Sequence, residues 1–350
     1  MNSRHAALVT AEIERGLLEP LADTYDITYA GWAIDKKVLD EGALVDRLRG
    51  MEVLVTSYDK VTATVIESSP SLRLVVCTRS NPVNVDQEAA RKAGISVAYT
   101  PGRNSDATAE FAVGLLLAVS RNIARANHMM LEGELTTDDA ERPGPLRDDV
   151  TWGAVKQVHP YVDLEGPQIF GKTMGIIGFG SIGSRVGRLM GGFGAEVIAY
   201  DPYLTEKDVA GAGVRLVDLD ELLRTSDFIS CHMKVTDSTR GLIDAAAFDK
   251  MKRTAFLVNN SRGAILVEED LIDALREHKI AGAALDVYAF EPLWAGHPFL
   301  TERFDNLVMT PHISGACEDA IRNHTAMAVD ELRRFAAGDA PSHGWAPPTR

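Results

Sequence analysis

Short apolar runs alternate along most of the chain with longer stretches of mixed apolar and charged residues. In the N-terminal third the apolar runs are residues 6–9, 53–56, 74–77 and 96–99, separated by charged, helix-like stretches such as 37–49. A second series of apolar runs follows at residues 174–177, 196–200, 228–231, 255–259, 282–286 and 307–309. Strands that alternate with helices predict parallel sheets with helices on both faces.

Three other segments complete this pattern. Residues 106–130 have an apolar-rich helical pattern, with Asn104 or Ser105 as a candidate N-cap, and are predicted to connect the two series. Residues 134–163 carry scattered prolines and acidic residues without a period, together with Trp152. They predict a long excursion that either contacts the substrate or forms a mobile or partner-facing loop. A last helix is expected over residues 319–337.

Composition narrows the class of protein. A length of 350 residues suggests about two domains. The 36 Lys and Arg against 50 Asp and Glu leave a net charge of −14, which argues against nucleic-acid binding. No apolar run reaches the roughly 20 residues of a membrane span, and the N-terminus lacks a signal-peptide core. We therefore expect no membrane partner. Cys77, Cys231 and Cys317 have no disulfide or zinc spacing, which favours a reducing compartment and a cytoplasmic protein.

A glycine-rich turn follows the predicted strand at 174–177 and begins a helical segment. It reads Gly178-Phe179-Gly180-Ser181-Ile182-Gly183, a G-x-G-x-x-G pattern. In a dinucleotide-binding fold these glycines allow the tight turn, the approach of the pyrophosphate and the packing of helix on strand. The next strand is followed by Asp201, whose carboxylate would accept hydrogen bonds from ribose hydroxyls and repel a 2′-phosphate. NAD is therefore predicted rather than NADP.

Several blocks between residues 72 and 320 resemble the D-isomer-specific 2-hydroxyacid dehydrogenases, which include phosphoglycerate, glyoxylate/hydroxypyruvate and D-lactate dehydrogenases. The blocks are residues 100–104 (TPGRN), 109–110 (AE), 178–183, 236–243 (TDSTRGLI), 260–263 (NSRG), 285–288 (LDVY) with 291–292 (EP), and 311–312 (PH). The resemblance implies an α/β fold of two Rossmann-like, doubly wound parallel-sheet domains with a cleft between them. A flavodoxin-like substrate domain would comprise residues 1–103 and 317–350, and an NAD-binding domain residues 104–316. It also implies a homodimer.

The same resemblance implies a catalytic set of Arg262, Glu291 and His312, and the chemistry makes sense of these residue types. An arginine is a rigid two-pronged donor that binds and orients the carboxylate of a 2-hydroxy acid. When a hydride leaves carbon 2, the hydroxyl proton must also leave, and a neutral histidine can accept it. A carboxylate on the other ring nitrogen fixes the tautomer and stabilises the imidazolium.

Other binding residues are also implied by the resemblance. Cofactor contacts are expected from Thr108, His232, Thr239 and Asp286. The loop whose backbone N–H groups bind the substrate carboxylate in the family is Arg79, Ser80 and Asn81 here, where the family often has Gly-Val-Gly. Arg79 either meets a phosphate, a second carboxylate or a hydroxyl of the substrate, or faces solvent. Lys234 stands where the family usually has proline and faces either cofactor phosphates or solvent.

The expected activity is transfer of a hydride between NAD and a D-2-hydroxy acid, which gives the 2-oxo acid. The substrate is expected to be a small or sugar-acid-like molecule, either with or without a phosphate group. The alternative is a non-catalytic protein of the same fold that senses NAD(H). Formate dehydrogenase shares the fold but pairs its histidine with glutamine, and Glu291 argues against it. The remaining histidines have no metal-site spacing, so no metal is expected.

Overall fold

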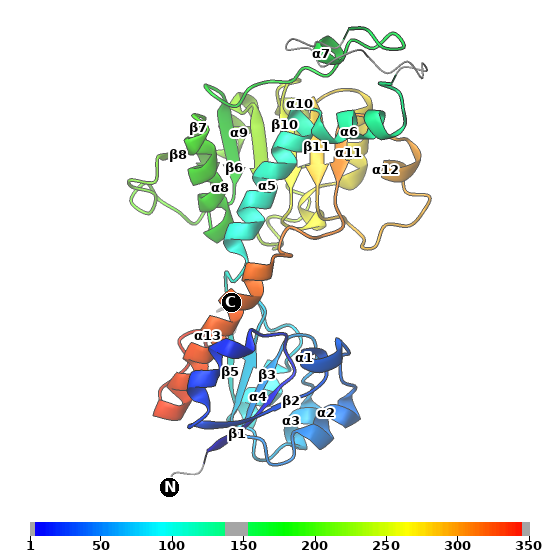
Figure 1. Cartoon of the computed structure of the whole chain (residues 1–350). Helices are drawn as coiled ribbons and strands as arrows, with labels where there is room; N and C mark the ends of the chain where they lie inside the picture. Colours follow the sequence, from blue (N-terminus) through cyan, green and yellow to red (C-terminus); the bar gives the residue numbers. More distant parts are fainter. Residues whose placement is uncertain (1–3, 137–152, 345–350) are drawn as a thin grey trace. The chain divides into compact units, whose positions relative to one another are not determined.

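The computed structural model describes residues 4–136 and 153–344, and the chain forms two compact units (Figure 1). The first unit comprises Met1–Asn104 and Ala316–Arg350, and the second comprises Ser105–Gly315. Each unit contains one parallel sheet. The predicted α/β class with two parallel-sheet domains is therefore confirmed.

The first unit has a five-stranded parallel sheet in the order β2-β1-β3-β4-β5, which is the flavodoxin-like order. Its strands are β1 (His5–Val9), β2 (Tyr25–Tyr29), β3 (Val53–Thr56), β4 (Leu74–Cys77) and β5 (Ser96–Tyr99). Its helices are α1 (Trp32–Asp35), α2 (Glu41–Arg47), α3 (Ala63–Glu67), α4 (Gln87–Lys92) and α13 (Glu318–Ala337), with short 3-10 turns η1 (Arg15–Leu17) and η2 (Glu19–Leu21).

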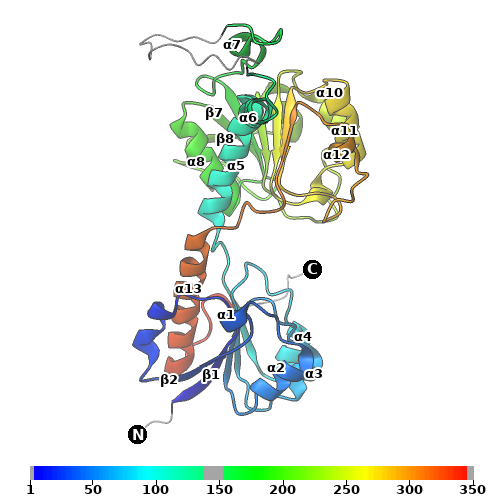
Figure 2. The ribbon, with the colours of Figure 1, turned by 45° about the vertical axis from the view of Figure 1, so that its right-hand side comes forward.

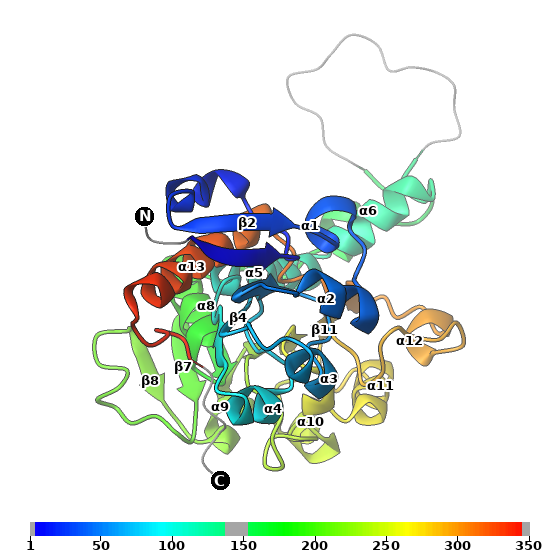
Figure 3. The ribbon, with the colours of Figure 1, turned by 90° about the horizontal axis from the view of Figure 1, so that it is seen from below.

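Both faces of this sheet are covered, as the unbroken apolar runs of its central strands require. Helix α13 packs on one face through Ala328, Val329 and Leu332, and the Tyr25 hydroxyl donates to the Leu332 carbonyl over 2.6 Å. Helices α2, α3 and α4 cover the other face (Figure 3). The C-terminal segment thereby completes the core of the N-terminal domain.

The second unit has a seven-stranded parallel sheet in the order β12-β11-β10-β9-β6-β7-β8. Its strands are β6 (Thr173–Ile177), β7 (Glu196–Tyr200), β8 (Val214–Leu216), β9 (Phe228–Cys231), β10 (Phe256–Asn259), β11 (Gly282–Leu285) and β12 (Leu307–Met309). Its helices are α5 (Ser105–Ser120), α6 (Ile123–Leu131), α7 (Pro160–Asp163), α8 (Ser181–Gly192), α9 (Leu219–Thr225), α10 (Ala245–Lys250), α11 (Glu268–Arg276) and α12 (Pro298–Thr301), with the 3-10 turn η3 (Gly263–Ile265).

Helices α5 and α8 cover one face of this sheet, and α9, α10 and α11 cover the other (Figures 1 and 2). The chain winds outward from β6 in one direction to β7 and β8, and then from β9 to β12 in the other direction. The strand order therefore reverses between β6 and β9. Open α/β sheets bind their ligands at the carboxyl ends of the strands at such a point.

The structure differs from the sequence-based prediction in its strands and in two helical segments. Strands β2 and β8 were not predicted. The pattern at 106–130 forms two helices rather than one, because Asn122 adopts a left-handed φ of 53° between α5 and α6. The helix-like stretch 37–49 is helical only over α2. Most of the predicted excursion, including Trp152, lies outside the described residues, and its last part contains α7.

In residues 4–136 and 153–344 no single helix is long and apolar enough to cross a membrane. Helices α5 and α6, bent by 63°, reach that length and composition only as a pair.

Candidate active site

The glycine-rich turn between β6 and α8 has the geometry of a phosphate-binding loop. Gly178 has a left-handed φ of 91°, which favours glycine, and a Cβ there would press on the backbone of His232 and Met233. A Cβ at Gly183 would collide with the Gly178 carbonyl oxygen, so this glycine allows α8 to start against the turn. At Gly180 a Cβ would meet nothing within 4 Å. Packing within the protein does not require a glycine at this exposed position, whereas a closely approaching ligand does.

The other predicted cofactor residues of this loop lie around the same turn. The Asp201 carboxylate accepts from the Phe179 N–H and the Tyr203 N–H, both over 3.0 Å. Ser181 begins α8, and its hydroxyl donates to Ser105 over 3.0 Å. Ile182 packs on the core cluster beneath the loop. The N-terminal amides of α8 and the carboxylate of Asp201, which binds Phe179, thus both lie at the glycine-rich turn. This arrangement fits the pyrophosphate and ribose of NAD.

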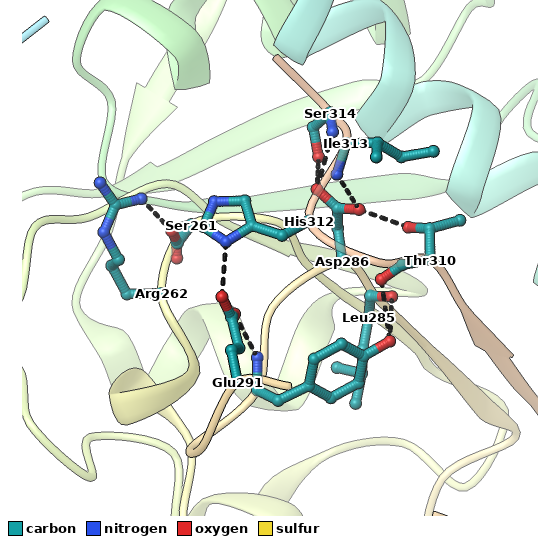
Figure 4. Close-up of polar contacts among 10 residues, drawn as sticks. Ser261, Arg262, Leu285, Asp286, Glu291, Thr310, His312, Ile313 and Ser314 are labelled. Carbon is teal, nitrogen blue, oxygen red and sulfur yellow. Dashed lines mark hydrogen bonds and ion pairs between the residues drawn. The ribbon is translucent and has the colours of Figure 1, made fainter. Parts of the chain in front are cut away.

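An acid–histidine pair forms at the carboxyl ends of β11 and β12 (Figure 4). The Nδ1 atom of His312 lies 2.7 Å from Oε2 of Glu291. The other oxygen of Glu291 accepts from the Tyr288 N–H over 3.0 Å, so the carboxylate is oriented by its own loop. Because Nδ1–H donates to a carboxylate, Nε2 holds the lone pair of the neutral ring. Nε2 has no protein partner within the described part of the chain and is free to exchange a proton.

The segment that carries His312 is fixed by a single buried carboxylate. Asp286 accepts from the Thr310 hydroxyl over 2.5 Å, from the Ile313 N–H over 2.9 Å and from the Ser314 N–H over 2.8 Å, and it also contacts the Ser314 hydroxyl. Its exposed fraction is 0%. His312 itself has a left-handed φ of 57°, a conformation that a non-glycine residue keeps only where its surroundings hold it.

Arg262 comes from the neighbouring loop after β10. Gly263 makes this placement possible, because a Cβ there would overlap the carbonyl of Tyr288 in the loop that carries Glu291. The Arg262 guanidinium is exposed, and Nη1 donates to the Ser261 carbonyl over 2.6 Å. No ion pair to Arg262 occurs in residues 4–136 and 153–344. A charge that is exposed and unpaired within this part of the chain remains available for a ligand carboxylate.

A second acid–histidine pair contacts the same loop and is less exposed than the first. His297 Nε2 is 2.8 Å from Oε1 of Glu268, and the side chains are 2% and 13% exposed. The other oxygen of Glu268 accepts from the Ala289 N–H over 3.0 Å. Nδ1 of His297 accepts from the Phe299 N–H over 3.2 Å, so the proton sits on Nε2. The pair thus anchors the loop of Glu291 through the Ala289 N–H.

A largely apolar cavity of about 530 Å³ adjoins the exposed pair. Its lining consists of Tyr288, Glu291, Pro292, Leu293, Leu300, Met309, Thr310, Pro311 and His312. Apolar walls next to an acid–base pair exclude water from one side of the reacting groups.

The remaining predicted cofactor residues are engaged within the protein. Thr108 is buried in α5, and its carbonyl accepts from the Asn260 side chain over 3.0 Å. His232 follows β9 and contacts the Ser230 hydroxyl through Nε2 over 2.8 Å. Burial lowers the pKa of His232 to about 3, so this ring is neutral. The Thr239 hydroxyl donates to the Lys234 carbonyl over 2.6 Å and thereby shapes the loop that passes near Gly178.

The predicted substrate loop belongs to the first unit. Arg79 is half-buried directly after β4, and Ser80 and Asn81 are exposed. Sequence reasoning did not single out Glu268 and His297, which are 29 residues apart and belong to no motif. Only the packing of α11 under the loop after β11 brings them together.

The chain is similar to known proteins over most of its length. The model of the D-isomer specific 2-hydroxyacid dehydrogenase NAD binding domain matches residues 113–314. A glyoxylate reductase of Thermococcus litoralis is 35% identical over 334 residues, which are 95% of this chain and 94% of that protein. A hydroxypyruvate reductase of Thermotoga maritima is 36% identical over 295 residues, 84% of this chain and 88% of that protein.

Among solved structures, the TT0316 protein of Thermus thermophilus superposes with a TM-score of 0.76 at 30% identity, over 97% of this chain and 100% of that one. The chain therefore belongs to the D-isomer-specific 2-hydroxyacid dehydrogenases, a family of NAD-dependent oxidoreductases, and its second unit contains the family's NAD-binding domain.

Proposed function

We propose that this protein interconverts a D-2-hydroxy acid and its 2-oxo acid with NAD, using His312 as the acid–base group, Glu291 as its partner and Arg262 as the carboxylate anchor. The observation that carries the proposal is the 2.7 Å contact between His312 Nδ1 and Glu291, which leaves Nε2 free to exchange a proton. The expected homodimer and cytoplasmic location remain predictions.

Each residue has a distinct task in the reaction. Arg262 would hold the substrate carboxylate through two parallel N–H donors and so fix the orientation of carbon 2. In the direction of oxidation, Nε2 of His312 would accept the hydroxyl proton, and in reduction the imidazolium would return it to the carbonyl oxygen. Glu291 would stabilise the imidazolium through Nδ1–H. Bound NAD supplies the acceptor for the hydride of carbon 2.

A non-catalytic NAD-sensing protein of this fold can carry the same Arg, Glu and His set, so the difference between the two functions lies in turnover. Here further hydrogen bonds hold the pair in place. Glu291 accepts from the Tyr288 N–H, and Asp286 and Glu268 bind the backbone on either side of the pair. Such positioning of an exposed Nε2 is suited to proton transfer and supports an enzyme.

The test is reduction of a panel of 2-oxo acids, followed by the loss of NADH absorbance. The panel would include glyoxylate, pyruvate, hydroxypyruvate and 3-phosphohydroxypyruvate. His312→Ala should lower kcat by about 10²- to 10⁴-fold with nearly unchanged NADH affinity, because only the proton transfer is lost. His128→Ala, which removes an exposed histidine of α6, is the matched control and should keep full activity. NADH binding without turnover on any acid would favour the sensor.

A further inference from the structure

Helix α5 packs against α8, the helix that begins at the glycine-rich turn, and the two helices touch at their first residues (Figure 1). The Ser181 hydroxyl at the start of α8 donates to the Ser105 hydroxyl at the start of α5 over 3.0 Å. One turn further along α8, Nε of Arg185 donates to Oδ1 of Asp106, the second residue of α5, over 2.7 Å. Polar contacts therefore join the two helices at the end where the cofactor turn lies.

The Arg185 side chain runs back toward this turn rather than away from it. Side chains of a helix lean toward its N-terminus, so a residue four positions after Ser181 lies over the first turn. Here Nη1 of Arg185 donates to the Ser181 carbonyl over 2.8 Å and to the Ser181 hydroxyl oxygen over 3.1 Å. Nη2 of Arg185 has no hydrogen bond in residues 4–136 and 153–344. The guanidinium thus lies beside the first residue of α8, where the helix presents its unpaired N–H groups.

The turn has little else with which to neutralise a diphosphate. Its three side chains are a phenyl ring, a hydroxyl and a branched alkyl group, at Phe179, Ser181 and Ile182. The Ser181 hydroxyl donates its one proton to the neighbouring helix and has none left for a phosphate. The backbone amides and the helix dipole supply only partial charges. Among the described residues, Arg185 is the one cation that hydrogen-bonds to residues 178–183.

Asp106 holds Arg185 through an exposed ion pair that is easily exchanged. The arginine and aspartate side chains are 34% and 61% exposed. Ion pairs at such exposure add little to stability, because water solvates both charges almost as well as the partner does. A guanidinium binds phosphate oxygens in the same two-pronged manner as it binds a carboxylate. The diphosphate is the stronger partner, because it carries two negative charges against one on Asp106.

We propose that Arg185 is a cofactor-binding residue whose guanidinium is shared between Asp106 and the diphosphate of NAD. In the free protein Asp106 holds the guanidinium at the start of α5. Bound NAD draws it onto a phosphate oxygen, so Asp106 loses its partner and thereby lowers the affinity for the cofactor. The proposal rests on NAD binding at the glycine-rich turn and not on the reaction proposed above, so the two can fail separately.

Binding measurements with fragments of the cofactor test the role of Arg185. NADH binding is followed by fluorescence, and ADP-ribose and adenosine are measured by displacement of NADH. ADP-ribose contains the diphosphate, whereas adenosine does not. Arg185→Gln should weaken binding of NADH and ADP-ribose by about tenfold or more, the loss expected for a charge-assisted hydrogen bond, and binding of adenosine by less than about twofold. Arg185→Lys keeps the charge and should bind ADP-ribose more tightly than Arg185→Gln does.

The competing acid gives a prediction of opposite sign. Asp106→Asn should tighten binding of ADP-ribose by about two- to fivefold, because an exposed ion pair no longer has to be broken. The gain should vanish in the double variant Asp106→Asn, Arg185→Gln. A general effect of the lost negative charge would persist in that double variant and would contradict the sharing.

Two matched controls remove the same charges elsewhere in the second unit. Arg188→Gln removes an exposed arginine three residues further along α8. Asp305→Asn breaks an ion pair with Arg125, in which the arginine and aspartate side chains are 37% and 58% exposed, almost as in the pair at the turn. Neither control should change the affinity for ADP-ribose by more than about twofold, because salt screens charges at a distance from the ligand.

Equal losses for ADP-ribose and adenosine in Arg185→Gln would reject the proposal, because the arginine would then only support the turn. A loss no larger than that of Arg188→Gln would reject it as well. An affinity that Asp106→Asn leaves unchanged or lowers would reject the competition. Selective loss of ADP-ribose binding in Arg185→Gln, with a wild type that reduces no 2-oxo acid, would keep the phosphate contact and reject the proposed reaction.

Discussion

The buried pair of Glu268 and His297 offers a sharp test of how the exposed acid–base pair is positioned. Both carboxylate oxygens of Glu268 accept hydrogen bonds, one from His297 Nε2–H and one from the Ala289 N–H. His297 cannot reverse its tautomer without cost, because its Nδ1 accepts from the Phe299 N–H. Every position in this short network is therefore committed as donor or acceptor.

Replacing Glu268 with glutamine keeps the shape of the side chain but turns one acceptor into a donor. Two donors must then face each other, at Ala289, at His297 or, if His297 changes tautomer, at Phe299. Loss of a charge-assisted hydrogen bond with one buried donor left unsatisfied should lower the free energy of unfolding by about 2–3 kcal/mol. Ala289 is two residues before Glu291, and a misplacement of about 1 Å near reacting groups costs about 100-fold in rate. We therefore expect kcat to fall by about 10- to 100-fold.

The assays are urea unfolding and steady-state kinetics with a 2-oxo acid that wild type reduces. Glu269→Gln is the control, since Glu269 is the next residue of α11 and is exposed. The affinity for NADH should be unchanged in both variants, because the glycine loop lies on other strands. If Glu268→Gln lost stability but kept the wild-type kcat, the pair would be structural only. If it lost neither, the assignment of donors and acceptors would be wrong.

Three other predictions concern the cofactor loop and the response to acid. Gly183→Ala should weaken NAD binding by at least about tenfold in calorimetry, because its Cβ would push α8 away from the Gly178 carbonyl; an unchanged Kd would contradict the packing. Asp201→Ala should narrow the ratio of kcat/KM between NAD and NADP, since the repulsion of a 2′-phosphate is lost; a ratio that stays fixed would remove Asp201 from the choice of cofactor. The pKa of His324 is lowered by burial to about 4, so the unfolded chain binds a proton that the folded chain does not as pH falls below 6.5. His324 should then cost the folded state about 2 kcal/mol between pH 6.5 and 5, and His324→Asn should show a smaller fall in urea unfolding over this range.

Most strands that the sequence predicted have side chains buried on both faces, and β12, whose residues are only partly buried, was predicted from its apolar run alone. Strands β3, β4, β9 and β11 are buried throughout and apolar except for Thr56 and Ser230, and a run of this kind is visible without any partner. Strand β2 has the burial pattern of an edge strand, with polar Asp26 and Thr28 between its apolar residues. Strand β8 has only three residues and none is buried. Both are defined by pairing with a neighbour, which the local sequence does not encode.

The residues of the candidate site also fall into two groups, those that the sequence predicted and those that it did not. Arg262, Glu291 and His312 could be predicted because each lies in a short block with a family resemblance and follows a predicted strand. Glu268, His297 and the pairing of Arg185 with Asp106 depend on contacts between segments far apart in the chain. The residues next to a histidine in this chain give no signal that distinguishes a buried, hydrogen-bonded histidine from an exposed one.

The carboxylate of Asp286 has a mechanical consequence for the connection between the two units. It binds the backbone of Ile313 and Ser314, which are the last residues before the chain leaves the second unit at Gly315. Any rotation of the backbone at Gly315 or beyond is therefore uncoupled from the imidazole of His312. The proton-transfer geometry is isolated from the linker, so this point of the chain suits insertion or domain exchange. A longer connection there should leave the Glu291–His312 distance intact.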